Sequence, residues 1–351
     1  MGGDEIGRTS PRGSPELVLR DRWISSVSDD ERLEDEKIPV LAIVGPTGVG
    51  KTALAMALAS ELPIEAVSVD SRQVYRRMNI GTGKPTPAQR RALRHHLVDV
   101  VDPDEGYDAA RFRREAAAAI ADIRARGGAA VLVGGTGLYF RALVRGLAML
   151  PAADLTLRRR LRAEAAAAGA AALHDRLAAL DPETAARLHP RDLVRVTRAL
   201  EVVLLTERSA STGRGTSWTL SSSPYRVVTV GLTMERHALY ARLDTRVDRM
   251  LADGLVAEVG GLIAGGFGVD LPSMQGIGYR HLVPVVTRHA PLGEAIRTMR
   301  RDTRRYAKRQ WTWFGREAGV YWVSVEPEDM GSAVIEVKKL IERTRVFDYS
   351  G

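Results

Sequence analysis

Apolar runs and helix-forming segments alternate along the first half of the chain. The apolar, β-prone runs cover residues 38–44, 66–69 and 129–133, and the helix-forming segments cover 53–62 and 108–126. Such an alternation with short connections is typical of a parallel sheet flanked by helices. The pattern therefore predicts an α/β fold.

A different pattern occupies residues 151–223, which are rich in alanine and arginine and poor in β-branched residues. Breaks at Asp181-Pro182 and His189-Pro190 divide this stretch into helix-length pieces. We predict an inserted all-helical subdomain, with the polar segment 209–223 as its flexible exit.

The apolar, β-prone character returns at residues 226–232, so the chain is expected to re-enter the sheet there. Thr233 is the expected N-cap of a helix over 235–251, and a last long helix is expected over 292–315. The core domain predicted in this way comprises residues 37–150 and 224–345.

The first 36 residues are polar and charged. They contain neither the apolar centre of a signal peptide nor a helical periodicity, which predicts a disordered extension. Nothing in the sequence approaches an uninterrupted apolar stretch of about 20 residues, so we expect no membrane span.

Charge and cysteine content narrow the range of partners. The 51 basic residues exceed the 43 acidic ones and give a net charge of +8, with an isoelectric point near 9.9. A phosphate-rich partner is consistent with that balance. The absence of cysteine excludes disulfides and thiolate metal sites and fits a reducing cytosol.

The most specific motif lies directly after the first apolar run. Residues 45–52 match G-x-x-x-x-G-K-[ST] between a predicted strand and a predicted helix. In that setting, backbone N–H groups and the helix N-terminus bind a di- or triphosphate. We therefore predict a P-loop NTPase-like fold in which Lys51 lies against the phosphates and the Thr52 hydroxyl reaches Mg²⁺. The predicted phosphate-binding residues are Gly45, Pro46, Thr47, Gly48, Val49, Gly50, Lys51 and Thr52.

Two further segments follow predicted strands and should reach the same edge of the sheet. Asp70 fits a Mg²⁺ ligand, a general base or a structural turn aspartate. Residues 134–139 form either a second ligand-binding glycine turn, with the Thr136 hydroxyl inside it, or a packing turn. The sequence contains no convincing apolar run ending in Asp-Glu, which disfavours a motor or a simple ATPase.

Arginines recur at helical spacing in two places. Arg242, Arg246 and Arg249 fit a helix whose first two guanidinium groups meet a diphosphate, although a solvated face is the alternative. The last long helix carries a basic stripe, which predicts a nucleic-acid partner unless an unidentified row of carboxylates lies opposite. The stripe comprises Arg297, Arg301, Arg304, Arg305 and Lys308, and it is followed by Trp311, Trp313 and Phe314.

In this order, the motifs resemble the tRNA dimethylallyltransferase family, also called tRNA isopentenyltransferases, from about residue 38 to 322. Besides the P-loop, the resemblance rests on segments 70–75, 80–82, 84–85, 95–99, 134–139, 195–201, 275–280 and 308–313. It implies transfer of a dimethylallyl group from dimethylallyl diphosphate to N6 of the adenosine 3′ of the anticodon in tRNA.

The resemblance also implies roles for individual residues. Asp70 would be the general base, Thr136 would help to hold the adenine, and Arg242 would lie at the diphosphate. Mg²⁺ would be the cofactor, the helical insertion would bind tRNA, and the partners would be the anticodon stem-loop and dimethylallyl diphosphate of a cytoplasmic monomer. The implied tRNA-contacting residues are Asp70, Ser71, Arg72, Gln73, Val194, Arg195, Val196, Thr197, Arg198, Gln275, Gly276, Ile277, Gly278, Tyr279, Arg280, Lys308, Arg309, Gln310, Trp311, Thr312, Trp313 and Phe314.

Three other functions remain open at this point. An isopentenyltransferase for free adenine nucleotides would not need the helical insertion or the basic helix. A small-molecule kinase would use ATP at the same loop, and a non-catalytic RNA-binding module would leave Asp70 and Thr136 unexplained. Many family members have a small residue where Val49 stands, a departure that affects only a side-chain contact.

Overall fold

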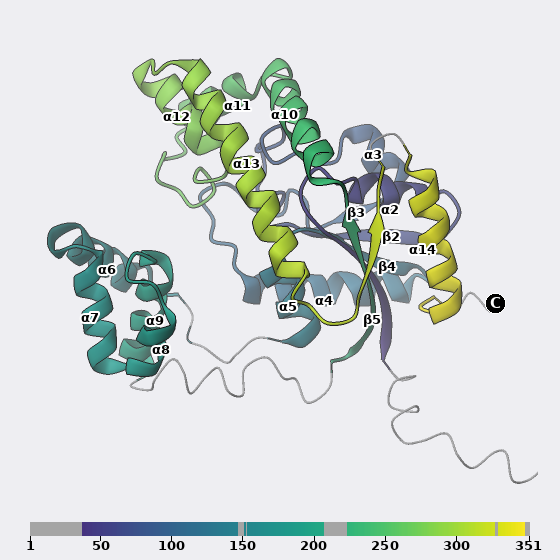
Figure 1. Ribbon diagram of the computed structural model, residues 1–351, viewed down its shortest axis with the longest axis horizontal. Helices are drawn as coiled ribbons and strands as arrows, with labels where there is room; N and C mark the ends of the chain where they lie inside the picture. The colour runs from purple at the N-terminus through teal and green to yellow at the C-terminus, as the bar shows by residue number, and fades with distance from the viewer. Residues whose placement is uncertain (1–36, 147–150, 152, 207–222, 327–328, 348–351) are drawn as a thin grey trace, which may run out of the picture. The chain divides into compact units, whose positions relative to one another are not determined.

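The computed structural model describes residues 37–146, 151, 153–206, 223–326 and 329–347 (Figure 1). A six-stranded sheet has the strand order β3-β2-β4-β1-β5-β6. Parallel pairing joins β1 to β4, β4 to β2, β2 to β3 and β5 to β6. The strands are β1 (Ile38–Val44), β2 (Ile64–Val69), β3 (His95–His96), β4 (Ala129–Gly134), β5 (Tyr225–Thr233) and β6 (Val320–Ser324).

Helices cover both faces of this sheet (Figure 1). On one face, Leu41, Ile43 and Val131 share a buried cluster with residues of α2 and α14. Neighbouring strand residues point to opposite faces, and α4 packs with α5 on the other face. Strands that are buried on both faces consist of continuous apolar runs. These helices are α2 (Lys51–Ala59), α3 (Pro87–Ala92), α4 (Ala109–Ala125), α5 (Gly137–Arg145) and α14 (Gly331–Thr344).

Four more helices follow β5. Helix α10 packs against α11 and α13, and α12 packs against the same two helices. Their shared cluster buries Val247, Leu262, Leu282 and Met299. The helices are α10 (Arg236–Ala252), α11 (Leu255–Ala264), α12 (Tyr279–Arg288) and α13 (Leu292–Phe314).

The helices between residues 155 and 206 have a hydrophobic core of their own, which includes Leu161, Leu177 and Leu200. Asp181 ends one helix and begins the next, because its side chain accepts a hydrogen bond from the Thr184 amide at 3.1 Å. The helices are α6 (Leu155–Ala168), α7 (Ala170–Leu180), α8 (Pro182–Arg187) and α9 (Leu193–Thr206).

The parallel sheet with helices on both faces confirms the predicted fold class. The helical content of 155–206 fits the predicted insertion, while the domain boundaries stay predictions. Residues 1–36 and nearly all of segment 209–223 lie outside the described residues. Within the described part of the chain, no helix is long and apolar enough to cross a membrane.

Two local expectations need correction. The N-cap predicted at Thr233 is wrong, because β5 runs through Thr233 and the Glu235 side chain instead accepts a hydrogen bond from the Ala238 amide at 2.8 Å. Strand β6 was missed: at the edge of the sheet it leaves Tyr321 and Trp322 partly exposed, so its sequence lacks the continuous burial of the other strands.

Candidate active site

The P-loop connects β1 to α2 in a conformation that depends on glycine. Gly45 has a φ of 134°, and a Cβ atom at this position would lie 2.5 Å from the carbonyl oxygen of Leu232 in β5. A side chain is therefore excluded by backbone angle and by space together. Val49 is fully buried in the core cluster. A residue change at Val49 thus alters core packing, since the side chain points away from the loop's ligand-binding surface.

Lys51 begins α2 and folds over the loop. Its Nζ donates hydrogen bonds to the carbonyl oxygens of Gly45 at 3.0 Å and Pro46 at 2.8 Å. Burial lowers the pKa of Lys51 to about 8; the charge of Asp70 opposes this shift, and that of Arg246 adds to it. The ammonium group is therefore poised to gain from a nearby anion.

A pocket of about 870 Å³ opens over the P-loop. It joins residues from the carboxyl ends of β2 and β4 with side chains of α10 and α13, as expected for a ligand site in a parallel sheet. The residues predicted from sequence that line it are Thr47, Gly48, Gly50, Lys51, Thr52, Asp70, Gln73, Gly134, Gly135, Arg242, Arg246, Arg249 and Gln310.

Asp70 has both the turn role and the pocket position that the sequence suggested. Its Oδ1 accepts hydrogen bonds from the backbone amides of Arg72 at 2.8 Å and Gln73 at 3.3 Å. The carboxylate also lines the pocket. These two amide contacts fix the carboxylate through Oδ1 alone, which leaves Oδ2 to take a proton.

Thr136 lies beside Asp70, although it does not itself line the pocket. Its Oγ1 accepts a hydrogen bond from the Ser71 amide at 3.1 Å, and it lies near Tyr306. Burial and the charge of Asp70 raise the pKa of Tyr306 to about 12, while the Thr136 contact opposes that shift. The Tyr306 hydroxyl therefore stays protonated in the pocket. Sequence reasoning missed Tyr306, because it occurs within the basic stretch of α13.

Three arginines of α10 reach the pocket. Arg242, Arg246 and Arg249 all line it. Arg242 and Arg246 are partly buried, whereas Arg249 is exposed, so the solvated-face alternative still applies to Arg249. Burial lowers the pKa of Arg246 from its ordinary value; the charge of Asp70 opposes this, and that of Arg242 adds to it. Several guanidinium groups directed into one pocket require an anionic ligand to balance them.

Gln310 ties the two glycine turns together. The Thr47 amide donates a hydrogen bond to its Oε1 at 2.8 Å, and its Nε2 donates one to the Gly135 carbonyl at 2.9 Å. A Cβ atom on Gly135 would lie 2.0 Å from Nε2, so this close approach requires glycine. In the structure the predicted turn is confined to residues 135 and 136, between β4 and α5, and Gly134 and Gly135 line the pocket.

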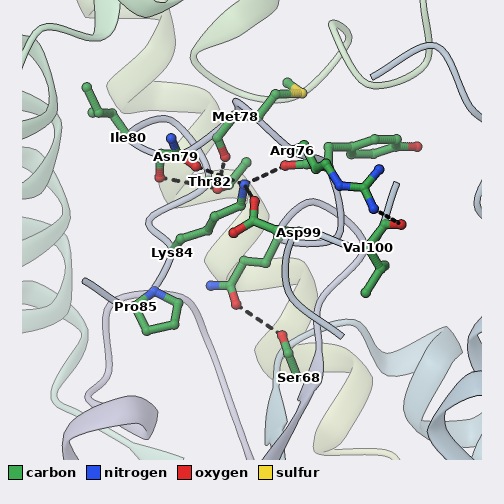
Figure 2. A network of polar contacts seen from close by, with 12 residues as sticks. Ser68, Arg76, Met78, Asn79, Ile80, Thr82, Lys84, Pro85, Asp99 and Val100 are labelled. Carbon is green, nitrogen blue, oxygen red and sulfur yellow. Dashed lines mark hydrogen bonds and ion pairs between the residues drawn. The ribbon is translucent and has the colours of Figure 1, made fainter. Parts of the chain in front are cut away.

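The loop that leaves Asp70 is held by Lys84 (Figure 2). The Lys84 Nζ donates hydrogen bonds to Asp99 Oδ1 at 2.6 Å and Asn79 Oδ1 at 3.0 Å, and it also donates one to the Tyr75 carbonyl oxygen. Burial lowers the pKa of Lys84, and the hydrogen bond with Asp99 opposes that shift. The network fixes the loop whose residues Thr82 and Gly83 line the pocket.

Thr52, the residue predicted to reach Mg²⁺, lines the pocket next to Lys51. Mg²⁺ at phosphate sites is commonly held by one or two protein groups together with phosphate oxygens. The described ranges contain no group of three or more His, Asp or Glu residues able to hold a metal. A single hydroxyl at the start of α2 fits a metal shared with a bound diphosphate.

Two of the predicted tRNA-contacting segments lie together. The Arg72 Nη1 donates a hydrogen bond to the Pro272 carbonyl oxygen at 2.7 Å, which joins segment 70–73 to the stretch leading into 275–280. In the latter segment, Tyr279 is buried and Arg280 forms an ion pair with Asp302 at 2.6 Å. Contacts of these segments with tRNA stay predictions.

The other two segments are helical and only partly accessible. In α9, Val194 is 77% exposed, whereas Val196 and Thr197 are buried. In α13, Lys308, Arg309 and Thr312 are exposed, and Trp311 and Trp313 are partly buried. Gln310 and Phe314 are buried in the same helix. The buried residues of these two segments would not contact RNA directly and would instead support the exposed residues beside them.

The basic stripe of α13 divides between two sides of the helix. Arg304 forms hydrogen bonds with both carboxylate oxygens of Asp244 at 2.9 and 2.7 Å, and Arg300 pairs with Asp248, so part of the unidentified carboxylate row lies on α10. Placing Arg304 in an outward stripe is therefore wrong. The exposed cations of the predicted stripe are Arg297, Arg301, Arg305 and Lys308. Of these, Arg301 and Arg305 also form ion pairs with Asp302 at 3.3 and 3.8 Å.

Family models match two overlapping parts of the chain. The model described as IPP transferase matches residues 73–317. A model described as ATPase family associated with various cellular activities matches residues 41–97, which include the P-loop.

Curated relatives and solved structures agree with the IPP transferase match. A tRNA dimethylallyltransferase of Geobacter metallireducens is 49% identical over 83% of this chain and 94% of its own length. A solved tRNA isopentenylpyrophosphate transferase of Bacillus halodurans is 41% identical, with a TM-score of 0.65 over 88% of this chain and 96% of its own. A eukaryotic dimethylallyltransferase acting on tRNA is 28% identical, with a TM-score of 0.70 over 88% of this chain and 79% of its own.

Proposed function

The chain belongs to the IPP transferase family, and from this premise we propose that it prenylates tRNA. It transfers a dimethylallyl group from dimethylallyl diphosphate to N6 of the adenosine 3′ of the anticodon and releases diphosphate. The observation that carries the proposal is one pocket that combines a P-loop, the α10 arginines and the carboxylate of Asp70. Such a pocket provides a diphosphate site and a proton acceptor side by side.

The diphosphate half of the reaction uses the cationic side of the pocket. The bond between C1 of the dimethylallyl group and a diphosphate oxygen breaks, and negative charge develops on that oxygen. Backbone amides of the P-loop, Lys51, Arg242 and Arg246 are positioned to stabilise this charge. Thr52 would hold Mg²⁺, which supplies further positive charge at the phosphates when bound.

The adenine half uses the carboxylate. The N6 lone pair is delocalised into the ring, so N6 attacks C1 effectively only when its proton is removed. Asp70 takes that proton through the oxygen that the Arg72 and Gln73 amides do not engage. Tyr306 lines the pocket beside this carboxylate and would contact the base, and Thr136 would act from behind it through the Ser71 amide. The target nucleotide must leave its stack to reach the pocket.

We extend the proposal to the binding partner and the setting. The anticodon stem-loop is the expected part of tRNA, because it contains the proposed target adenosine, and the exposed cations of α13 would contact its phosphates. The protein would act as a monomer in the cytoplasm. Size-exclusion chromatography with light scattering, with and without tRNA, measures the oligomeric state.

The test is transfer of label from radiolabelled dimethylallyl diphosphate to tRNA. We expect Asp70→Asn to lower kcat by about 10²-fold or more while diphosphate affinity is retained. Asparagine keeps an oxygen for the Arg72 and Gln73 amides, so the loop should hold its shape. Asp104→Asn, at an exposed site, is the matched control. Full turnover in Asp70→Asn refutes the base role, whereas label on free adenine nucleotides or ATP-dependent phosphotransfer would replace the proposed function.

A further inference from the structure

Glu258 of α11 has a set of hydrogen bonds that no sequence motif indicated. Its Oε2 accepts from the backbone amides of Asn79 and Ile80, both at 2.8 Å. Its Oε1 accepts from the Gly81 amide at 3.2 Å and the Tyr279 hydroxyl at 2.6 Å. One side chain thus binds three consecutive amides of a loop and joins them to α12.

The bound loop leads directly into the pocket. A Cβ atom on Gly81 would lie 2.5 Å from the ring of Tyr279, so the loop is seated closely on that ring. Two residues later, a Cβ atom on Gly83 would lie 1.7 Å from Nη2 of Arg246. The Gly83 backbone therefore forms the wall against which the Arg246 guanidinium rests, and its carbonyl accepts a hydrogen bond from Gln73 Nε2 at 3.3 Å.

We propose that Glu258 is a positioning residue for diphosphate binding, an inference that rests on the proposed function. By holding residues 79–81, it sets the position of Gly83 and, through Gly83, the direction of the Arg246 guanidinium. Lys84 also holds this loop, through Asn79 Oδ1 and the Tyr75 carbonyl oxygen (Figure 2). Glu258 itself is not among the residues that line the pocket.

The negative charge of Glu258 is essential to this arrangement. Four donors converge on its two oxygens, and hydrogen bonds to a charged acceptor are roughly twice as strong as neutral ones. A glutamine at this position would present an N–H₂ group to at least one of the loop amides. That amide would lose its partner, and the loop would shift away from α11.

The test compares three variants with wild type. We expect Glu258→Gln to raise both the KM for dimethylallyl diphosphate and the Kd for inorganic diphosphate with Mg²⁺ by about tenfold or more, since a small misplacement in a site can cost up to about 10²-fold. The KM for tRNA should stay unchanged. Tyr279→Phe removes one of the four donors and should raise the same Kd by a smaller factor. Asp253→Asn, at an exposed site next to α11, is the control and should behave as wild type.

The possible outcomes distinguish a positioning role of Glu258 from a purely structural one. A lowered melting temperature in Glu258→Gln with an unchanged diphosphate Kd would show a purely structural role and overturn the inference. If Glu258→Gln does not fold, an unchanged Kd in Tyr279→Phe overturns it. A wild-type protein that binds diphosphate but does not label tRNA would refute the proposed function instead, because diphosphate binding is measured separately from transfer.

Discussion

Diphosphate affinity should fall as the pH rises through about 8, because Lys51 loses its proton there. Burial lowers the pKa of Lys51 to about 8 in the folded chain, whereas an exposed lysine stays charged to about pH 10. Only the ammonium form donates hydrogen bonds to phosphate oxygens. The favourable contribution is therefore fully present below pH 8 and is lost above it.

The size of the effect follows from the protonated fraction. With a pKa of about 8, roughly nine tenths of Lys51 is protonated at pH 7 and roughly one tenth at pH 9. If the bound state requires the cation, the Kd for diphosphate rises about tenfold between these two values. The neighbouring Asp70 keeps this pKa from falling further, so Asp70→Asn should move the midpoint to a lower pH.

Isothermal titration with Mg²⁺ and inorganic diphosphate from pH 6.5 to 9.5 measures this dependence. The ligand also titrates in this range, so Lys51→Arg is the control: arginine keeps its charge at every pH used. The ratio of the two Kd values cancels the ionisation of the ligand. A ratio that stays constant across pH 8 would refute the reasoning, since it would mean that Lys51 is charged throughout.

Two further predictions concern α13. Arg301→Gln with Arg305→Gln should make the slope of log K against log salt for tRNA shallower by about one to two units, because both side chains are exposed although they also pair with Asp302. Arg300→Gln with Arg304→Gln should change the slope little, because those half-buried guanidinium groups pair with aspartates of α10. Equal slopes in both double variants would contradict an outward phosphate-binding face. Gln310→Leu should lower the free energy of unfolding by about 2–4 kcal/mol, since a buried amide and a buried carbonyl each lose a partner. Urea denaturation checks the latter, and a change below about 0.5 kcal/mol would show that the two glycine turns do not depend on this bridge.

The elements that the sequence predicted well are those whose signal is local. The strands at 38–44 and 129–133 are apolar throughout because both faces of the sheet are covered, and the P-loop is a contiguous motif between two of them. Asp108 was the expected start of a helix, and its side chain does accept a hydrogen bond from the Arg111 amide. At each of these positions, residues close in sequence were sufficient to predict the local structure.

The features that the sequence did not predict depend on contacts between distant residues. Glu258 lies 177 positions from Gly81, and Gln310 lies 263 positions from Thr47. Glu258 belongs to no motif, and Gln310 was expected only as a tRNA contact within segment 308–313. Their contacts with the two loops were not predicted, because the helices that carry them are brought there only by packing. The aspartate partners of Arg304 and Arg300 were hidden for the same reason, since they lie on a separate helix.

Helix α13 joins the exposed cations to the pocket without a break. Arg301 and Arg305 are exposed, while Tyr306 and Gln310 line the pocket from the same helix. Each residue of an α-helix adds about 1.5 Å and about 100° of rotation. One inserted residue between the two groups would turn the outer cations by more than a quarter turn relative to the pocket, with every original side chain still present. We therefore expect this helix to tolerate substitution of its exposed residues better than the insertion or deletion of one residue.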